Sequence, residues 1–151
     1  MNSLNVTKDN GYAFLDFIQI NEPEMNYYEP LAGSYAVIKC EGKYLMCYNT
    51  WRKQWEIPAG QREAHETPKE CAIRELYEET GQTIEDLNFI GLLKSKNLST
   101  GTVKYNPVYY GAMDELQPFV RNAETSQIIL WDLQEQIGTI DEVDLRLLEY
   151  V

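Results

Sequence analysis

Short apolar runs separated by polar turns occupy most of the chain and predict a β-sheet. A two-residue break, Glu41-Gly42, stands between two of these runs and has the spacing of a β-hairpin turn. Asn97–Gly101 marks a second turn, and Asn21–Pro30, with two prolines, predicts a connecting loop. The predicted strands are Tyr12–Ile20, Ser34–Cys40, Lys43–Tyr48, Trp55–Ile57, Leu87–Leu93, Thr102–Met113 and Ser126–Trp131.

One long segment carries helix signals at both of its ends. Thr67 is a good N-cap, Pro68 takes the first helical position, and Glu70 completes a capping box three residues after the cap. Gly81 can adopt the left-handed conformation that ends a helix. The sequence therefore predicts a helix over about Pro68–Thr80.

Two shorter helices are expected near the end of the chain, over Leu133–Ile137 and Asp141–Tyr150. Strands, one long helix, further strands and terminal helices follow one another in an order that suits a mixed sheet with helices packed on it. The chain has 151 residues and shows no internal repeat, low-complexity stretch or linker, so it fits one domain over residues 1–151.

The long helix gathers three acids on one side. At about 100° per residue, its apolar side chains turn towards the sheet while Glu75, Glu78 and Glu79 share another, exposed face. Like charges at these spacings repel, and the helix dipole disfavours anions near the C-terminal end. One interpretation is a solvated acidic face. The other is a site for Mg²⁺ or Mn²⁺, because these ions take hard oxygen ligands.

Charge and cysteine content narrow the function classes. The net charge of −11 disfavours binding of long nucleic acids, because that binding depends on neutralising phosphates with Lys and Arg. The charge is consistent either with solubility or with acids that are concentrated to bind divalent cations. No apolar run reaches the length of a membrane span, and Met1–Asn10 has no leader pattern. Cys40, Cys47 and Cys71 have no metal-binding spacing. A cytoplasmic protein with reduced thiols is expected.

A set of spaced residues runs through the long helix and the loop before it: Gly60, Glu66, Arg74, Glu75, Leu76, Glu78, Glu79 and Gly81. Their pattern resembles the Nudix box, the signature of the Nudix hydrolase (MutT-like) family. The order of elements extends the resemblance to roughly residues 33–151, and residues 1–32 form an N-terminal extension with a possible extra strand. The resemblance implies a Nudix fold of the α/β class, a three-layer α/β/α sandwich with a mixed β-sheet.

The resemblance also implies roles for individual side chains. Glu78 and Glu79 match the principal metal ligands of the family, and Glu75 matches a residue that binds metal or helps to activate water. Arg74 and Glu66 match a pair that orients the loop and the catalytic acids, although an ordinary surface ion pair is the alternative. Mg²⁺ is therefore the expected cofactor, with Mn²⁺ as a substitute.

Three further positions bear on the same site. The carbonyl of Ala59 matches a backbone metal ligand of the family. Gln82 stands where the box usually has an aliphatic residue, which affects packing at the helix end. His65 stands where a glycine is frequent, and it either touches substrate or has no role.

The resemblance also implies a carboxylate base outside the box, which in many family members sits in a loop a few residues before a tryptophan that ends a strand and deprotonates the attacking water. Glu124, seven residues before Trp131, is the first candidate and Glu115 is the second, with a solvent-facing loop acid as the alternative for each. Aromatic rings that stack on a base or ribose are also expected near the site, although a role in the core is equally open for each. These candidate substrate-binding residues are Trp51, Trp55 and Tyr110, together with Tyr109.

The resemblance implies a Mg²⁺-dependent pyrophosphohydrolase that cleaves a nucleoside diphosphate linked to another moiety through attack of water on phosphorus. Nucleoside triphosphates and nucleotide sugars such as ADP-ribose both remain open as substrates. The alternatives are a catalytically silent Nudix-fold domain that binds a nucleotide for regulation, and an acidic interaction module without metal. The expected partner is a small nucleotide, with no long nucleic acid and no membrane, and a homodimer is left open.

Overall fold

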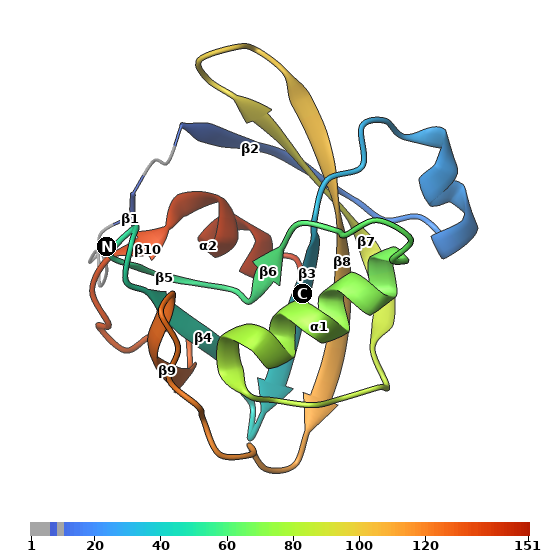
Figure 1. Ribbon diagram of the computed structural model, residues 1–151. Coiled ribbons are helices and arrows are strands. Elements are labelled where there is room, and N and C mark those ends of the chain that lie inside the picture. The colour runs from blue at the N-terminus through green and yellow to red at the C-terminus, as the bar shows by residue number, and fades with distance from the viewer. Residues whose placement is uncertain (1–6, 9–10) are drawn as a thin grey trace.

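The computed structural model describes residues 7–8 and 11–151 (Figure 1). Apart from Thr7 and Lys8, the segment Met1–Asn10, for which no leader was expected, lies outside the described residues. The helices are the 3₁₀ helix η1 (Glu22–Tyr27), α1 (Pro68–Thr80) and α2 (Glu142–Leu148). The strands are β1 (Thr7–Lys8), β2 (Tyr12–Ile18), β3 (Ser34–Cys40), β4 (Lys43–Asn49), β5 (Gln54–Glu56), β6 (Ala59–Gly60), β7 (Asn88–Asn97), β8 (Val103–Met113), β9 (Thr125–Trp131) and β10 (Ile140–Asp141).

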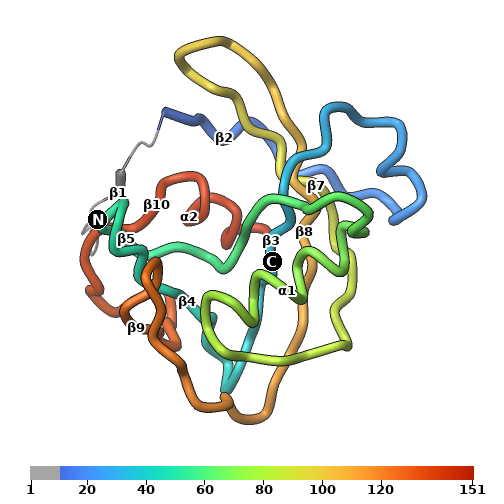
Figure 2. The backbone as a smooth tube through the Cα atoms, in the orientation of Figure 1, coloured from blue at the N-terminus to red at the C-terminus, as the bar shows by residue number. Residues whose placement is uncertain are grey.

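The ten strands found in the described residues belong to one mixed sheet. Its order is β1-β10-β5-β4-β3-β8-β7-β2, with β6 paired to β3 and β9 paired to β4. β3 and β8 run parallel in the middle, β10 runs parallel to β5 and to β1, and the other pairs are antiparallel. Figure 2 shows how the chain leaves β6, loops over to α1, and returns to the sheet through β7.

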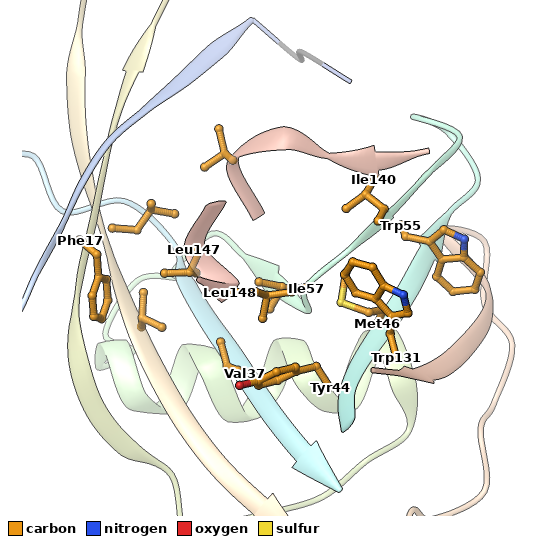
Figure 3. Close-up of a cluster of buried hydrophobic side chains, with 13 residues drawn as sticks. Phe17, Val37, Tyr44, Met46, Trp55, Ile57, Trp131, Ile140, Leu147 and Leu148 are labelled. Atoms are coloured by element: carbon orange, nitrogen blue, oxygen red, sulfur yellow. The ribbon is translucent and has the colours of Figure 1, made fainter. Parts of the chain in front are cut away.

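Helices cover both faces of this sheet, as the alternating side chains of β3 show. Val37 points into a core cluster that contains Leu147 of α2 (Figure 3). Ile38, the next residue, points to the opposite face and shares a cluster with Leu76 of α1. The predicted three-layer α/β/α sandwich with a mixed sheet is therefore confirmed.

The helix α1 begins and ends at the predicted residues. Thr67 Oγ1 accepts the N–H of Glu70 at 3.1 Å, and Glu70 Oε1 accepts the N–H of Thr67 at 2.9 Å, which completes the capping box. Gly81 ends the helix with a φ of 79°, a conformation in which a residue with a side chain would be strained. Local capping signals thus fixed the element that carries the candidate site.

The predicted strands are present, with some ends shifted. β3 and β4 form the predicted hairpin, with positive φ at both Glu41 and Gly42, as a two-residue turn requires. The strand predicted to end at Leu93 continues as β7 to Asn97, because it pairs with β2 on one side and β8 on the other. The short strands β6 and β10 were not predicted, since two residues leave no periodic pattern. The predicted loop Asn21–Pro30 contains the 3₁₀ helix η1.

The short helix predicted over Leu133–Ile137 is wrong, because this segment forms a turn. Leu133 has a φ of 69°, in the left-handed region that a helix excludes. Asp132 Oδ1 accepts the N–H groups of Gln134 and Glu135, each at 2.8 Å. A side chain therefore satisfies the backbone donors that a helix would have used. The other predicted terminal helix is present as the shorter α2.

Candidate active site

Acidic side chains from α1 and from the loop before it converge on Arg74. The guanidinium group lies 3.0 Å from Glu75 Oε2 and 3.2 Å from Glu78 Oε1. It forms two bonds with Glu66, from Nε to Oε2 at 2.6 Å and from Nη2 to Oε1 at 3.0 Å, and donates to the carbonyl of Gln61 at 2.8 Å. These bonds hold the pKa of Glu66 below its usual range. Arg74 thus ties the loop to the helix and orients the acids on both.

The loop between β6 and α1 passes against Glu75. A β-carbon on Gly60 would overlap the Glu75 carboxyl group, so a larger residue there would displace this carboxylate. Burial raises the pKa of Glu75, while the charge of Arg74 acts in the opposite direction. His65 in the same loop is exposed and has a φ of 66°, a conformation that glycine adopts without strain.

Glu79 is buried, in contrast to the expectation of an exposed face, which is wrong for this residue. Glu79 is only 7% exposed, and its Oε1 accepts the N–H of Ala59 at 3.1 Å. The thiol of Cys47 lies 3.8 Å from the same oxygen. Burial, together with the charges of Glu124 and Glu75, raises the pKa of Glu79 to about 9. The carboxyl group is thus held largely out of water beside other acids.

A further buried acid, Glu56 on β5, was missed by the sequence analysis. Its Oε1 accepts bonds from Asn49 Nδ2 at 3.3 Å and Arg52 Nη2 at 3.0 Å. Its Oε2 accepts bonds from Arg52 Nε and Gln54 Nε2, each at 2.6 Å. Four bonds fill the usual acceptor positions of a carboxylate, so Glu56 organises its neighbours. The available signal was an acid within an apolar strand just before Pro58.

Asn49 links this buried acid to the candidate base Glu124. Its Nδ2 lies 3.3 Å from Glu56 Oε1 and 3.0 Å from Glu124 Oε2. The charge of Glu124 in turn raises the pKa of Glu79, which brings the candidate base into the electrostatic environment of the box. Glu115 is exposed, and its charge acts on the thiol of Cys40 instead.

The segment that carries Glu124 is anchored to the end of α1 by polar side chains. Gln82 Nε2 donates to the carbonyl of Gln117 at 2.8 Å, and Gln82 Oε1 accepts the N–H of Gln117 at 2.7 Å. Asn122 Nδ2 donates to the carbonyl of Glu78 at 3.0 Å. The polar residue at a normally aliphatic box position therefore holds the loop between β8 and β9.

The predicted substrate-binding aromatic residues do not lie together. Trp51 is 67% exposed in the turn between β4 and β5. Trp55 is buried in the core on the α2 side, where its Nε1 donates to the carbonyl of Ile137 at 2.7 Å (Figure 3). Tyr110 packs against the same core, and Tyr109 is fully buried on the opposite face. Of this set, Trp51 is exposed, Trp55 and Tyr109 are buried, and Tyr110 is partly buried and lines a separate cavity of about 240 Å³.

A cavity of about 310 Å³ adjoins the acidic site. It reaches the site through Ala59 and Glu56, and two smaller cavities of about 180 and 60 Å³ share Tyr35 and Lys104 with it. Space for a small molecule therefore continues from the box towards β2 and α2. The remaining lining residues are Tyr12, Arg52, Ile57, Asp141 and Asp144.

The carboxylates of the acidic site are suitable ligands for divalent cations, although they are not preorganised around a common point. Within residues 7–8 and 11–151, no three His, Cys, Asp or Glu side chains stand in an arrangement that could hold a metal ion. The contacts explain why: Glu75 and Glu78 turn to Arg74, and Glu79 turns to a backbone N–H. Crowded carboxylates, one of them with a strongly raised pKa, are still the hard oxygen donors that Mg²⁺ prefers. Metal binding would require these side chains to rotate.

The metal-free protein is expected to lose stability as pH rises from about 5 to about 9. The pKa of Glu79 is raised from 4.5 to about 9 on folding, so in this window the folded protein holds a proton that the unfolded chain has released. Rising pH therefore favours unfolding, and a bound cation that replaces the proton should stabilise the protein more at high pH. Unfolding temperatures measured in chelator and in millimolar Mg²⁺ test this.

The matched control for this experiment is Glu79→Gln, which cannot titrate. In chelator, the unfolding temperature of this variant should depend less on pH. Some pH dependence should persist, because burial also raises the pKa of Asp144, which the variant retains. An equal Mg²⁺-induced shift at every pH in the unsubstituted protein would contradict the coupling between the proton and the cation.

Comparison with known proteins identifies similar sequences and folds. A model of the NUDIX domain matches residues 30–148. The phosphatase NudJ of Escherichia coli K12 is 44% identical over 57 residues, which are 36% of this chain and 37% of that protein. The match thus spans little more than a third of the length of this curated relative.

Solved structures resemble the whole fold at low identity. MutT NUDIX hydrolase from Burkholderia pseudomallei has a TM-score of 0.69 at 20% identity, over 82% of this chain and 99% of that one. The pyrophosphohydrolase BsRppH of Bacillus subtilis has 0.66 at 20%, over 89% of each chain. The NUDIX domain of Shewanella oneidensis NrtR, complexed with ADP ribose, has 0.66 at 17%, over 86% and 96%. At these identities the likeness shows the fold.

The helices in the described part of the chain were also compared with the requirements for a membrane span. None of them is both long enough and apolar enough to cross a bilayer.

Proposed function

The chain belongs to the Nudix family, and we propose that it is a Mg²⁺-dependent pyrophosphohydrolase that cleaves a nucleoside diphosphate linked to another moiety. The observation that carries this proposal is the complete set of box acids around Arg74, with Glu79 buried beside Glu124. A protein that only bound a nucleotide would have no need of a buried, destabilised carboxylate at this position. Mn²⁺ is proposed as a substitute for Mg²⁺.

The box acids are proposed to hold the metal, and Arg74 to keep them oriented. Bound Mg²⁺ would neutralise the diphosphate oxygens and stabilise the leaving phosphate. Arg74 fixes the loop through Glu66, which keeps the loop that precedes α1 against the acids. The groups assigned to the metal are the carboxylates of Glu75, Glu78 and Glu79 and the carbonyl of Ala59.

Glu124 is proposed as the base that takes a proton from the attacking water. Its Oε2 is held by Asn49 Nδ2 at 3.0 Å, which leaves Oε1 to accept the proton.

Glu124→Gln is expected to lower kcat about 100-fold or more with a smaller change in KM, because positioned general bases contribute about 10²–10⁴-fold. The amide oxygen of glutamine still accepts the bond from Asn49, so the fold should be retained. Glu115→Gln is the matched control and should leave kcat unchanged, since Glu115 is exposed. Initial rates of the two variants, measured with a substrate that the unsubstituted protein hydrolyses, distinguish the two candidate bases. A slow Glu115→Gln variant beside a normal Glu124→Gln variant would transfer the role to Glu115.

The second candidate function is a Nudix-fold domain that binds a nucleotide for regulation without hydrolysis. The likeness to the NUDIX domain of NrtR, which was solved with ADP ribose, supports the nucleotide binding that this candidate shares with the enzyme. It predicts nucleotide binding in the absence of turnover, and Glu79→Gln would then change neither binding nor any measured rate.

A substrate screen with Mg²⁺ or Mn²⁺ tests the proposed function. Nucleoside triphosphates, nucleotide sugars, dinucleoside polyphosphates and capped RNA ends are incubated with the protein, and release of phosphate or pyrophosphate is measured. The enzymatic function is supported if hydrolysis occurs, is abolished by chelator and is absent in the Glu79→Gln variant. Binding of a nucleotide without hydrolysis of any compound supports the regulatory domain.

The proposed partner is a small nucleotide, because a net charge of −11 opposes long nucleic acids. A cytoplasmic location is proposed because the three cysteines are buried free thiols. Association into a homodimer is measured by light scattering of the purified chain.

A further inference from the structure

Two glutamine side chains anchor the start of the loop between β8 and β9, which carries the proposed base Glu124. The Gln82 amide bonds to the backbone of Gln117, donating to its carbonyl at 2.8 Å and accepting its N–H at 2.7 Å. The Gln117 amide bonds in the same way to the backbone of Thr83, at 3.1 and 2.8 Å. Gln82 is completely buried, where hydrogen bonds are stronger than in water. The start of the loop therefore has a defined position relative to α1.

Asn122 anchors the other end of this loop, next to the base itself. Its Nδ2 donates to the carbonyls of Glu78 at 3.0 Å and Glu79 at 3.3 Å. Its Oδ1 accepts the N–H groups of Glu124 at 3.1 Å and Thr125 at 2.9 Å. α1 lies beside β9, the strand that follows the loop (Figure 1). One side chain thus connects the backbone of two proposed metal ligands to the backbone of the proposed base.

The remaining contacts of Glu124 come from β4 and the turn after it. The N–H of Thr50 donates to the Glu124 carbonyl at 2.8 Å, and Asn49 Nδ2 donates to the carboxylate at 3.0 Å. Arg52 Nη2 lies 3.7 Å from the same carboxylate oxygen. The carbonyl and the carboxylate of Glu124 are therefore bound on the β4 side, while its N–H is bound through Asn122 to α1. A shift of this residue would break bonds on at least one side.

We propose that Gln82 and Asn122 are positioning residues, which hold the base Glu124 at a fixed place relative to the metal-binding acids of α1. The inference rests on the proposed function and adds residues that touch neither the metal nor the attacking water. They act through the backbone of the base and of α1. Such positioning affects the rate strongly, because a displacement of about 1 Å in a reacting group can cost about 100-fold. The polar residue at the last box position thus gains a role in the reaction.

Gln82→Leu removes the bonds to Gln117 with a side chain of similar size and of the aliphatic type that the box usually has here. We expect kcat to fall about tenfold, because the base is displaced by a fraction of an ångström. KM and the rise in unfolding temperature with Mg²⁺ should stay unchanged, since Glu75, Glu78 and Glu79 keep their side-chain contacts. The fold should be retained, because Gln117 is exposed and water can bond its freed backbone groups.

Asn122→Ala should lower kcat in the same way, and Asn97→Ala is its matched control. Asn97 Oδ1 accepts the N–H groups of Ser99 and Thr100 in the turn between β7 and β8, as Asn122 Oδ1 does with two N–H groups before β9. Both substitutions remove a side chain that organises a turn, so both should lower the unfolding temperature. Only Asn122→Ala should slow turnover, and equal rates for the two variants would overturn the inference.

A double-mutant cycle with Glu124→Gln distinguishes positioning of the base from a purely structural role. If Gln82 acts through the base, Gln82→Leu should slow the unsubstituted protein about tenfold and leave the Glu124→Gln variant almost unchanged, since no base is left to be misplaced. A structural role would slow turnover by the same factor in both backgrounds. That second result would overturn the inference.

Amide hydrogen exchange of the metal-free full chain tests the anchoring without turnover. The N–H groups of Gln117 and Glu124, which bond to Gln82 and Asn122, should exchange more slowly than in an unstructured peptide. Gln82→Leu should speed exchange at Gln117, and Asn122→Ala should speed it at Glu124. Exchange at the rate of an unstructured peptide in the unsubstituted protein would overturn the inference.

The outcomes also separate this inference from the proposed function. Hydrolysis by the unsubstituted protein, with a normal kcat in both Gln82→Leu and Asn122→Ala, would reject the positioning role and leave the enzyme. Absence of hydrolysis of every screened compound by the unsubstituted protein would reject the enzyme, and the two anchors would then have no role in a reaction.

Discussion

Glu79→Gln is expected to lower kcat roughly 100- to 1,000-fold, since metal assistance is worth several kcal/mol of transition-state stabilisation and each 1.4 kcal/mol is tenfold. Glutamine is neutral, so the substitution weakens cation binding at the carboxylate that is most shielded from water. Glu79 is 7% exposed, and the charges of Glu124 and Glu75 act on it directly. A bound cation therefore meets several carboxylates at once, and removing the central one should affect both binding and rate.

The fold should survive this change, for a reason that differs from surface exposure. With a pKa of about 9, the Glu79 side chain of the metal-free protein is mostly neutral at pH 7, and glutamine has the shape of that neutral form. Its amide oxygen can still accept the N–H of Ala59. We expect an unfolding temperature in chelator at least equal to that of the unsubstituted protein, with the largest gain at alkaline pH.

Initial rates and thermal unfolding of the same preparation check the prediction. Glu85→Gln, an exposed acid in the loop after α1, is the control and should change neither quantity. A Glu79→Gln variant that hydrolyses substrate at a near-normal rate would remove Glu79 from the metal site. If the variant is slow because it is unfolded, its melting curve will show this. That result would contradict the expectation that glutamine can replace the neutral Glu79 side chain without loss of the fold.

The helix α1 shows what sequence alone can predict about this protein. Thr67, Glu70 and Gly81 act through bonds within a few residues of themselves, so their pattern gives the helix bounds directly. The box acids follow from spacing on that helix, and Arg74 does contact Glu66, Glu75 and Glu78. Local chemistry and short spacing were therefore sufficient for the scaffold of the site.

The burial of Glu79 could not be predicted in the same way. A helical wheel places Glu75, Glu78 and Glu79 on one side, yet they differ in exposure because segments distant in sequence cover only part of that side. Ala59, 20 residues earlier, bonds Glu79, and Asn122, 44 residues later, bonds the backbone of Glu78. Only the paired strands and the anchored loop reveal which acid is shielded.

The acids outside the box show the same limit. Glu124 was found through its distance from Trp131, but Asn49, which holds it, lies 75 residues away in the chain. Glu56 was read as a strand residue without a role. Its four donors lie within seven residues of it in the chain, but the turn between β4 and β5 is what brings their side chains to its carboxylate. Neither kind of polar contact leaves a periodic signal in a single sequence.

Arg74→Lys is expected to lower the free energy of unfolding by about 2–3 kcal/mol and the turnover number by about 100-fold, because lysine keeps the charge but loses the planar fork. The guanidinium group makes two bonds to Glu66 and one to the carbonyl of Gln61, and an ammonium group cannot reproduce both together. The side chains of Arg74 and Glu66 are 21% and 11% exposed, so water screens their interaction only weakly.

Arg146→Lys provides the matched control for this substitution. Arg146 pairs with Glu149 at 3.4 Å, but the two side chains are 47% and 62% exposed. Solvent screens this pair, so the change should cost less than about 0.5 kcal/mol and leave turnover unaffected. Denaturant unfolding of both variants, with initial rates on the same samples, gives the comparison.

A double-mutant cycle with Glu66→Gln then measures what the Arg74–Glu66 pair contributes by itself. If the pair fixes the loop before α1, the two single changes and the double change should reduce turnover by similar amounts, because each releases the same loop. The coupling energy in unfolding should exceed about 1 kcal/mol, which is the upper value for exposed ion pairs. A smaller coupling, with normal turnover in Glu66→Gln, would make the contact an ordinary surface ion pair, and Arg74 would then hold the loop through the carbonyl of Gln61.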